Sequence, residues 1–430
     1  GSTGELLQKL QEGRGDEALR GLYALDGSDA SLEKGRERAV RVVRAFEAEF
    51  GARPEAALFS GPGRTEIGGN HTDHQHGRVV CGSVDLDMLA CAAPNGTDLV
   101  RIQSEGYPAL EVDLRDLKVR EEEKNSSPAL VRGVAARLAE LGCRPAGFDA
   151  YVTSTVLSGS GLSSSAAYEI LVATIIDCFF GGGTLDPVER AKVGQYAENV
   201  YFGKPCGLMD QMGSSVGGAV AIDFADPAAP VVKKVEYDFT RSGHALCIVD
   251  TGSCHADLTD DYADITREMG AVAAHFGKKF LRDVDEGAFR AALPQLRQEC
   301  GDRAVLRTMH FFEEDCRAEQ EAQALEQGDF AAFLALVDQS GLSSALNLQN
   351  TWSAAAPQQQ AIPVALAVGR ELLGGSGAIR VHGGGFAGTI QAFVPNEKLE
   401  TFQQGMEELL GPGMCHILHI RPQGGCVVLK

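Results

Sequence analysis

The chain has 430 residues, more than one ordinary hydrophobic core accommodates, so its length predicts two or three domains. Apolar residues make up 44% and charged residues 23%, a composition typical of folded proteins that excludes a disordered or fibrous chain. The formal net charge of −20 disfavours nucleic acid and anionic membrane surfaces as partners, because both require basic patches.

Cysteine usage and hydropathy indicate an intracellular setting. The eleven cysteines are odd in number and scattered, without a Cys-x-x-Cys pair, which predicts reduced thiols rather than a disulfide framework or a zinc site. The longest apolar stretches fall short of the roughly 18–20 residues that span a bilayer. No charged region followed by an apolar one marks a signal peptide at the start of the sequence. We therefore expect a cytoplasmic protein without a membrane partner.

Hydrophobic periodicity predicts the elements of the first half of the chain. Helices are expected at 5–50, 130–141, 164–180 and 187–201, and strands at 79–93, 98–112 and 148–157. The strand at 148–157 and the helix that begins near Ser164 are separated by a loop rich in glycine and serine.

The second half of the chain is mainly helical between two groups of short strands. Its strands are expected at 245–250, 378–381, 389–394 and 416–419, with helices between 262 and 373. Strands and helices alternate without a regular βαβ period, so we expect an α+β fold. We expect two domains, 1–235 with a helical extension at 1–50, and 236–430.

The segment Val156–Ala167 combines glycines with several hydroxyl side chains just before a helix. Gly159 and Gly161 permit a close backbone approach, and the helix N-terminus directs N–H groups and a positive dipole toward a ligand. This arrangement suits a phosphate group and leaves a serine hydroxyl for a metal ion. It is not a Walker A loop, because no Gly-Lys-Ser/Thr closes it. An ordinary strand–loop–helix turn is the alternative.

A second segment, at residues 61–77, is too glycine-rich for a regular helix and carries several chemically specific side chains. One interpretation is a metal cluster formed by His71, Asp73, His74 and His76. Another is a polar cradle for a sugar, with Arg64 supplying positive charge nearby. A plain polar surface loop is the third.

Two further segments carry candidate chemistry. Glu198 and Asp210 lie twelve residues apart and could supply a metal ligand and a catalytic carboxylate. An aspartate among apolar neighbours is costly unless it is paired, and Arg64 is the natural partner of Asp210. The glycines at 383–385 form either a tight structural turn or a ligand contact.

In their order along the chain these segments resemble the galactokinase branch of the GHMP kinase superfamily. The matching motifs are Gly-Arg-x-x-x-x-Gly-x-His-x-Asp at 63–73, Gly-x-Gly-Leu-Ser-Ser-Ser-Ala-Ala at 159–167, Pro-Cys-Gly-x-Met-Asp-Gln at 205–211 and Gly-Gly-Gly-Phe-x-Gly at 383–388. The resemblance covers about residues 40–395. It implies an N-terminal domain like that of ribosomal protein S5, a ferredoxin-like C-terminal domain, and an active site between them.

The resemblance also implies roles for individual residues in an ATP- and Mg²⁺-dependent phosphorylation of the anomeric hydroxyl of a sugar, most simply galactose. Asp210 and Arg64 would be catalytic. Residues implied to bind ATP are Gly159, Ser160, Gly161, Leu162, Ser163, Ser164 and Ser165. Those implied to bind Mg²⁺ are Ser164, Ser165 and Glu198, and those implied to bind the sugar are Asn70, His71, Asp73, Tyr262 and Gly384. The expected partners are the sugar and ATP alone, and the expected state is a monomer.

The sequence departs from the family pattern at the sugar segment. Asn70 stands where the family usually has Glu, and His74 where it usually has Tyr. Loss of a negative charge keeps galacturonate and N-acetylgalactosamine open as substrates. A catalytically silent sugar sensor and a metal-dependent hydrolase that uses the histidines are the remaining alternatives.

Overall fold

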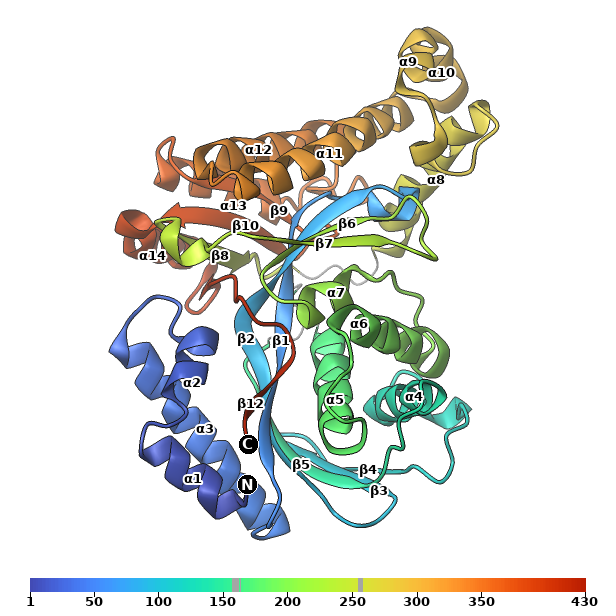
Figure 1. Ribbon diagram of the computed structural model, residues 1–430. Coiled ribbons are helices and arrows are strands. Elements are labelled where there is room, and N and C mark those ends of the chain that lie inside the picture. Colours follow the sequence, from blue (N-terminus) through green and yellow to red (C-terminus); the bar gives the residue numbers. More distant parts are fainter. Residues whose placement is uncertain (157–161, 163, 254–257) are drawn as a thin grey trace.

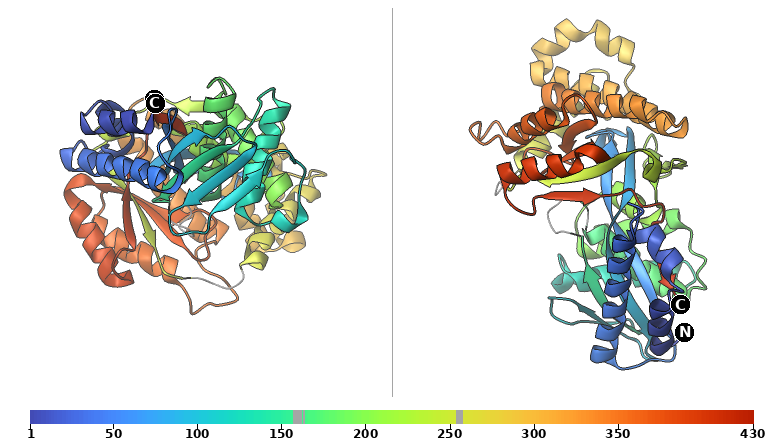
Figure 2. Two further views of the ribbon diagram at one scale, coloured as in Figure 1. Left: turned by 90° about the horizontal axis from the view of Figure 1, so that it is seen from below. Right: turned by 90° about the vertical axis from the view of Figure 1, so that its left-hand side faces the viewer.

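A computed structural model describes residues 1–156, 162, 164–253 and 258–430 of the chain. Two long strands, β1 (Ala57–Gly68) and β2 (Arg78–Pro94), run from the lower part of the molecule into the upper part (Figure 1). The N-terminal helices and the last strand lie together beside the lower part, and both chain ends are close to each other there (Figures 1 and 2).

The larger sheet has the strand order β12-β1-β2-β5-β3-β4, with β6 paired to β2 and β7 to β6. Its remaining strands are β3 (Leu99–Ser104), β4 (Leu110–Asp113), β5 (Phe148–Ser154), β6 (Ala219–Asp223), β7 (Val231–Val235) and β12 (Cys426–Leu429). The pairs are antiparallel except for β3 with β5, which run parallel.

Helices from the first half of the chain cover both faces of this sheet. They are α1 (Thr3–Gln11), α2 (Asp16–Tyr23), α3 (Asp29–Phe50), α4 (Ser127–Glu140), α5 (Ser164–Phe180), α6 (Pro187–Tyr196) and α7 (Met209–Ser215). Local sequence fixes several of their starts: Ser28 accepts a hydrogen bond from Ser31 N and caps α3, and Asp186 caps α6 with Pro187 at its first position.

Strands β1 and β2 are buried on both faces of the sheet. Successive side chains along each strand point to opposite faces. On one face, Leu58 and Leu89 belong to the core that α1, α2 and α3 form with the sheet. On the other face, Phe59 and Ala90 belong to the core with α4 and α5. A strand covered on both sides lacks the apolar–polar alternation of a surface strand.

The second half of the chain forms a smaller antiparallel sheet with the strand order β11-β8-β10-β9. Its strands are β8 (His244–Asp250), β9 (Ala378–His382), β10 (Thr389–Pro395) and β11 (Cys415–Leu418). The accompanying helices are α8 (Thr259–His275), α9 (Glu286–Ala291), α10 (Leu293–Cys300), α11 (Asp302–Glu326), α12 (Phe330–Ser343), α13 (Ala361–Leu373) and α14 (Leu399–Leu410). Figure 1 shows α11 and α12 side by side above this sheet.

One hydrophobic core joins the two sheets. Ile67 of β1 and Val84 of β2 belong to the same buried cluster as Ile248 of β8 and Phe333 of α12. The far ends of the two long strands are therefore part of the second half's packing. The proposed boundary between 235 and 236 coincides with the end of β7, and the last strand, β12, returns to the first sheet beside β1.

The α+β architecture and most elements agree with the sequence prediction, but several features differ. The helix expected at 5–50 is three helices, α1, α2 and α3, and the strand expected at 98–112 is two strands, β3 and β4. Residues 61–68, where no strand was expected, continue β1, and Gly61 leaves room for α5, with Leu171 Cβ 2.9 Å from the place of a glycine Cβ. The helix expected at 187–201 changes after Tyr196 to a π-helical turn at Ala197–Phe202. Strands β6, β7 and β12 and helix α14 were not predicted.

Ten cysteines lie in the described part of the chain, and all ten carry free thiols. Also within the described ranges, no helix is both long and apolar enough to cross a membrane.

Candidate active site

Arg64 of β1 and Asp210 in the first turn of α7 form an ion pair. Arg64 Nε and Nη2 lie 2.8 and 2.7 Å from Asp210 Oδ1. The side chain of Arg64 is 10% exposed, whereas that of Asp210 is 34% exposed, so the carboxylate faces solvent and the guanidinium lies behind it. Burial alone would lower the pKa of Arg64, but the charge of Asp210 raises it. The expected partnership of these two residues is confirmed.

A glycine in α7 makes room for this pair. A Cβ on Gly213 would lie 2.8 Å from Arg64 Cβ, closer than real Cβ contacts allow. The helix that presents Asp210 can therefore pack directly on the strand that presents Arg64.

Four of the expected sugar-binding residues lie in one cluster. His71 Nε2 lies 2.9 Å from the carbonyl oxygen of Gly384, and the His71 ring stacks on that of Tyr262 with centroids 6.3 Å apart. The Tyr262 hydroxyl donates to the Gly385 carbonyl at 3.1 Å. Asp73 follows His71 in the same turn, and burial, with a contribution from the charge of Asp210, raises its pKa. The structure therefore joins the 71–73 turn, α8 and the 383–385 glycines at one place.

The side chain of Asn70 is enclosed by protein groups. It is fully buried, and its amide nitrogen donates to the carbonyl of Gly383 at 2.7 Å and to Glu66 Oε1 at 3.1 Å. Its amide oxygen accepts from Ser344 Oγ at 3.1 Å and from Asn350 Nδ2 at 2.9 Å. Both hydrogens and both lone pairs are used by protein groups. The side chain therefore forms a structural link between the two halves of the chain, and the expected sugar contact stays a prediction.

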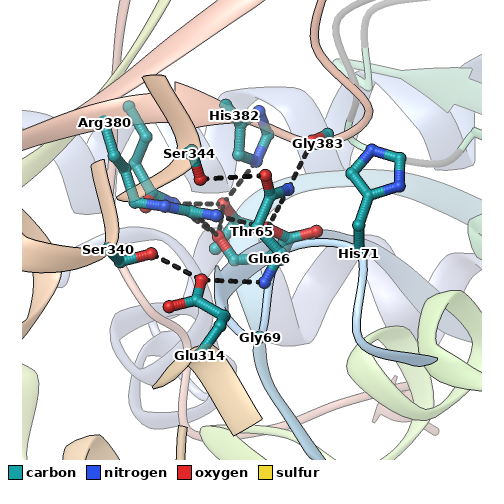
Figure 3. Close-up of polar contacts among 12 residues, drawn as sticks. Thr65, Glu66, Gly69, His71, Glu314, Ser340, Ser344, Arg380, His382 and Gly383 are labelled. Atoms are coloured by element: carbon teal, nitrogen blue, oxygen red, sulfur yellow. Dashed lines mark hydrogen bonds and ion pairs between the residues drawn. The ribbon is translucent and has the colours of Figure 1, made fainter. Parts of the chain in front are cut away.

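The backbone of Asn70 is held in the same way. Its N–H donates to Glu314 Oε2 at 3.0 Å, and His310 Nε2 lies 2.9 Å from its carbonyl oxygen. Glu314 also accepts from Ser340 Oγ at 2.6 Å (Figure 3). Helices α11 and α12 thereby fix the start of the turn that carries His71.

A second set of buried polar contacts holds the end of β1 against the second sheet. Arg380 of β9 forms an ion pair with Glu66, donates to the Glu66 carbonyl at 3.0 Å, and donates to Gln391 Oε1 at 3.0 Å (Figure 3). Thr65 Oγ1 lies 2.9 Å from His382 Nε2, and burial, with the charges of the neighbouring arginines, lowers the pKa of His382 well below its usual value. These partners come from distant segments, and among them Thr65 and Glu66 lay within the 61–77 segment that the sequence singled out.

Behind Asp210 lies a group of buried carboxyl and amide side chains. Gln211 Nε2 donates to Glu169 Oε1 at 3.0 Å and to Glu198 Oε2 at 3.2 Å. Burial, and next the charge of Glu198, raises the pKa of Glu169 well above its usual value. Glu198 was expected from the sequence. Glu169 and Gln211 were missed as site residues, although Gln211 is part of the 205–211 motif.

This group fits a hard divalent cation. Glu198 offers a carboxylate, and Glu169 Oε2 and Gln211 Oε1 are buried acceptors without a hydrogen-bond partner among the described residues. Carboxylate and hydroxyl oxygens are the ligands that Mg²⁺ prefers. Ser164 and Ser165 open α5, the helix that also carries Glu169.

The expected nucleotide loop is described only at its end. Gly159, Ser160, Gly161 and Ser163 lie outside the described residues. Leu162 is fully buried, and its carbonyl accepts from Arg64 N at 3.0 Å, which links the end of the loop to β1.

The histidines at 71–76 do not gather as metal ligands do. The ring of His76 stacks on Phe280 with centroids 3.6 Å apart. Burial lowers the pKa of His74 to about 3. Among the described residues, no group of three or more His, Cys, Asp or Glu side chains is arranged to hold a metal ion.

Comparisons with known proteins show which proteins this chain is similar to. Residues 129–218 match the family of GHMP kinase N-terminal domains, and residues 44–94 match the galactokinase galactose-binding signature. The galactokinase of Streptomyces coelicolor is 31% identical over 363 residues, which cover 84% of this chain and 90% of that protein. The crystal structure of Lactococcus lactis galactokinase with galactose superposes with a TM-score of 0.72 at 23% identity, covering 89% of this chain and 98% of that one. Methanococcus jannaschii mevalonate kinase has a TM-score of 0.60 at 14% identity, covering 86% and 99%. The two solved structures share the fold.

Proposed function

Because the chain belongs to the galactokinase family of GHMP kinases, we propose that it transfers the γ-phosphoryl group of ATP to the anomeric hydroxyl of galactose at Asp210 and Arg64. It is a sugar kinase. The residue assignment rests on the ion pair between the buried Arg64 guanidinium and the partly exposed Asp210 carboxylate. The charge of Asp210 contributes to the raised pKa of Asp73, which lies in the same turn as His71, so the ion pair is near the His71–Tyr262 cluster.

The arrangement supports a direct transfer. The Asp210 carboxylate accepts the proton of the sugar O1 hydroxyl as the bond between O1 and the γ-phosphorus forms. The bond from that phosphorus to the β,γ-bridging oxygen breaks, and ADP leaves with its electron pair. Arg64 forms an ion pair with Asp210 and offsets the negative charge of the transferred group. Positioning and charge neutralisation supply most of the rate enhancement in such transfers.

We propose that ATP lies along the 159–165 segment and the start of α5. Ser164, Ser165 and Glu198 would hold Mg²⁺. When bound, this ion would neutralise part of the negative charge of the phosphate groups. The protein's own contribution is the free N–H groups at the N-terminus of α5.

The sugar lies, in this proposal, against His71, Asp73, Tyr262 and Gly384. Asp73 can accept from a sugar hydroxyl, and the His71–Tyr262 stack is held by the Gly384 and Gly385 carbonyls. Asn70 is assigned to the support of this wall rather than to sugar contact.

The test is an ADP-release assay with MgATP against galactose, galacturonate and N-acetylgalactosamine, for the wild-type protein and for Asp210→Asn. We expect turnover with galactose that Asp210→Asn reduces by about 10²–10⁴-fold, the usual share of a general base, while galactose binding measured by calorimetry persists. Preference for another sugar would show that this sugar, and not galactose, is the substrate. No turnover with any sugar would favour a silent sensor, and an active Asp210→Asn variant would remove the base assignment.

We also propose that the enzyme acts as a cytoplasmic monomer with no partners besides its two substrates. The net charge of −20 supports a monomer, because chains of like charge repel one another. Light scattering after size exclusion tests the monomer, since a dimer would elute with twice the 45.6 kDa chain mass.

A further inference from the structure

Gln211 connects two buried carboxyl groups that come from different parts of the chain. Its Nε2 lies 3.0 Å from Glu169 Oε1 and 3.2 Å from Glu198 Oε2. Glu169 and Gln211 are fully buried, and Glu198 is 4% exposed. One amide group therefore holds both carboxyl groups in place, away from bulk water.

The three residues belong to the three elements that the proposed reaction needs. Glu169 lies on α5, one helical turn beyond Ser165, so both side chains occupy the same face of that helix. Glu198 lies in the π-helical turn Ala197–Phe202, a local form often found at functional sites. Gln211 directly follows Asp210 in α7. The hydrogen bonds of Gln211 thus connect helix α7, which carries Asp210, with helix α5 and with Glu198, the predicted metal ligand.

The surrounding packing is shaped for this contact. A Cβ on Gly194 of α6 would lie 3.1 Å from Gln211 Cγ and 3.2 Å from Glu169 Oε1. The glycine therefore allows the amide and the carboxyl group to meet against the backbone of α6. Glu169 Oε2 and Gln211 Oε1 have no hydrogen-bond partner among the described residues, so protein groups leave both oxygens unoccupied beside Glu198.

We propose that Glu169 and Gln211 act as a positioning pair that orients Glu198 for the divalent cation and fixes Asp210 relative to the nucleotide helix. This inference rests on the proposed kinase function and adds to it two residues that do not touch the reacting atoms. If Glu169 is absent, the Gln211 amide loses one of its two carboxyl acceptors and Glu198 loses its orientation. Residues that orient metal ligands typically change metal affinity or activity by about 10–100-fold.

The experiment compares Glu169→Met, Gln211→Met and the double variant with the wild-type protein. Methionine keeps the length of each side chain and removes the hydrogen bond. Two quantities are measured: Mn²⁺ affinity by electron paramagnetic resonance in the presence of a non-hydrolysable ATP analogue, and the Mg²⁺ dependence of ADP release. Glu169→Gln keeps an acceptor for the Gln211 amide and serves as the conservative variant.

The matched control is Glu321→Met. Glu321 of α11 is also fully buried, and both its carboxyl oxygens lack a hydrogen-bond partner among the described residues. It packs against Gly68 at the far end of β1 instead of against the Glu198 turn. Its substitution reports what the loss of a buried carboxyl group does by itself.

We expect each single methionine variant to weaken Mn²⁺ binding by about tenfold, and the double variant to weaken it little further, because the two residues act as a unit. Glu169→Gln and Glu321→Met keep Mn²⁺ affinity within about twofold, well short of the usual effect. Unchanged Mn²⁺ affinity in the single variants, with only a lower melting temperature, would overturn the inference. So would effects that multiply in the double variant. A wild-type protein that binds Mn²⁺ but phosphorylates no sugar would instead remove the proposed function.

Discussion

Arg64 and Asp210 lie 146 positions apart in the sequence, yet Arg64 Nη2 is 2.7 Å from Asp210 Oδ1. The contact forms because β1 and α7 pack together where Gly213 removes a side chain. The Arg64 side chain is 10% exposed and that of Asp210 34% exposed, so the cation lies behind the carboxylate that we propose as the base.

Replacing Arg64 tests whether the two residues act as a unit. We expect Arg64→Met to lower kcat by about 10²–10³-fold, since it removes a cation that stabilises developing charge. Steady-state rates with galactose and MgATP measure this loss. An Arg64→Met/Asp210→Asn enzyme in which the two losses multiply would contradict the joint role.

Gly213→Ala tests the packing that creates the pair. An added Cβ would lie 2.8 Å from Arg64 Cβ, so the arginine or the helix must shift. We expect a loss of stability of about 1–3 kcal/mol, as for other overpacked sites, together with a lower kcat. Gly270→Ala in α8 is the control, because a Cβ there meets nothing within 4 Å. Denaturant unfolding should show this control gaining about 1 kcal/mol from helix propensity. Equal behaviour of the two variants would remove the packing argument.

Asn70→Asp tests the structural role of that side chain. The carboxylate would replace the amide donor opposite two acceptors, the Gly383 carbonyl and Glu66 Oε1. We expect a destabilisation of about 1–3 kcal/mol, the usual cost of leaving buried groups unsatisfied. The ratio of kcat/KM for galactose to that for 6-deoxygalactose should stay unchanged. A changed ratio would instead restore Asn70 as a direct contact of the sugar C6 hydroxyl.

His419 gives the protein a defined pH dependence of stability. Its Nδ1 lies 3.0 Å from Asp85 Oδ2 of β2. Burial alone would lower the pKa of His419, but the Asp85 hydrogen bond and the charges of Asp85 and Asp26 raise it above 6.5. A group with a raised folded-state pKa stabilises the fold fully below its unfolded pKa and loses this contribution as pH rises through the folded pKa.

We therefore expect His419→Gln to lower the free energy of unfolding more at pH 6 than at pH 9. Urea unfolding of both proteins at the two pH values measures the difference. A deficit that grows with pH would show that the sign is wrong.

Asp87 of β2 links the N-terminal helices to the sheet. Its carboxylate accepts from Arg38 of α3 and Tyr23 of α2, and it pairs with Arg421 near the C-terminus. Asp87 and Arg421 are fully buried, whereas Arg38 and Tyr23 are partly exposed, and opposing charges lower the pKa of Asp87 against the effect of its burial. We expect Asp87→Asn to cost about 3–5 kcal/mol of unfolding free energy, because it leaves buried cations without their counter-ion. Tyr23→Phe removes one hydrogen bond and should cost about 1 kcal/mol. Equal losses in the two variants would contradict the charge argument.

The sequence by itself predicted most helices and strands and the motifs of the candidate site. Periodic apolar positions are local signals, so they can be recognised without a structure. The sequence also showed the Gly/Ser segment and the 205–211 motif, because both are local patterns. An aspartate among apolar neighbours needs a cation, which predicted the pairing of Asp210 with Arg64 that the structure shows.

Only the tertiary structure decided which side chains the site uses and which support it. Asn70 reads as a sugar contact in sequence, but Gly383, Ser344 and Asn350 occupy its hydrogen-bonding groups from more than 270 positions away. The same holds for the bridge from Gln211 to Glu169 and for β12, which returns from the chain end to pair with β1. Hydrogen-bond saturation and strand pairing depend on partners that packing brings together, and local sequence carries no record of that geometry.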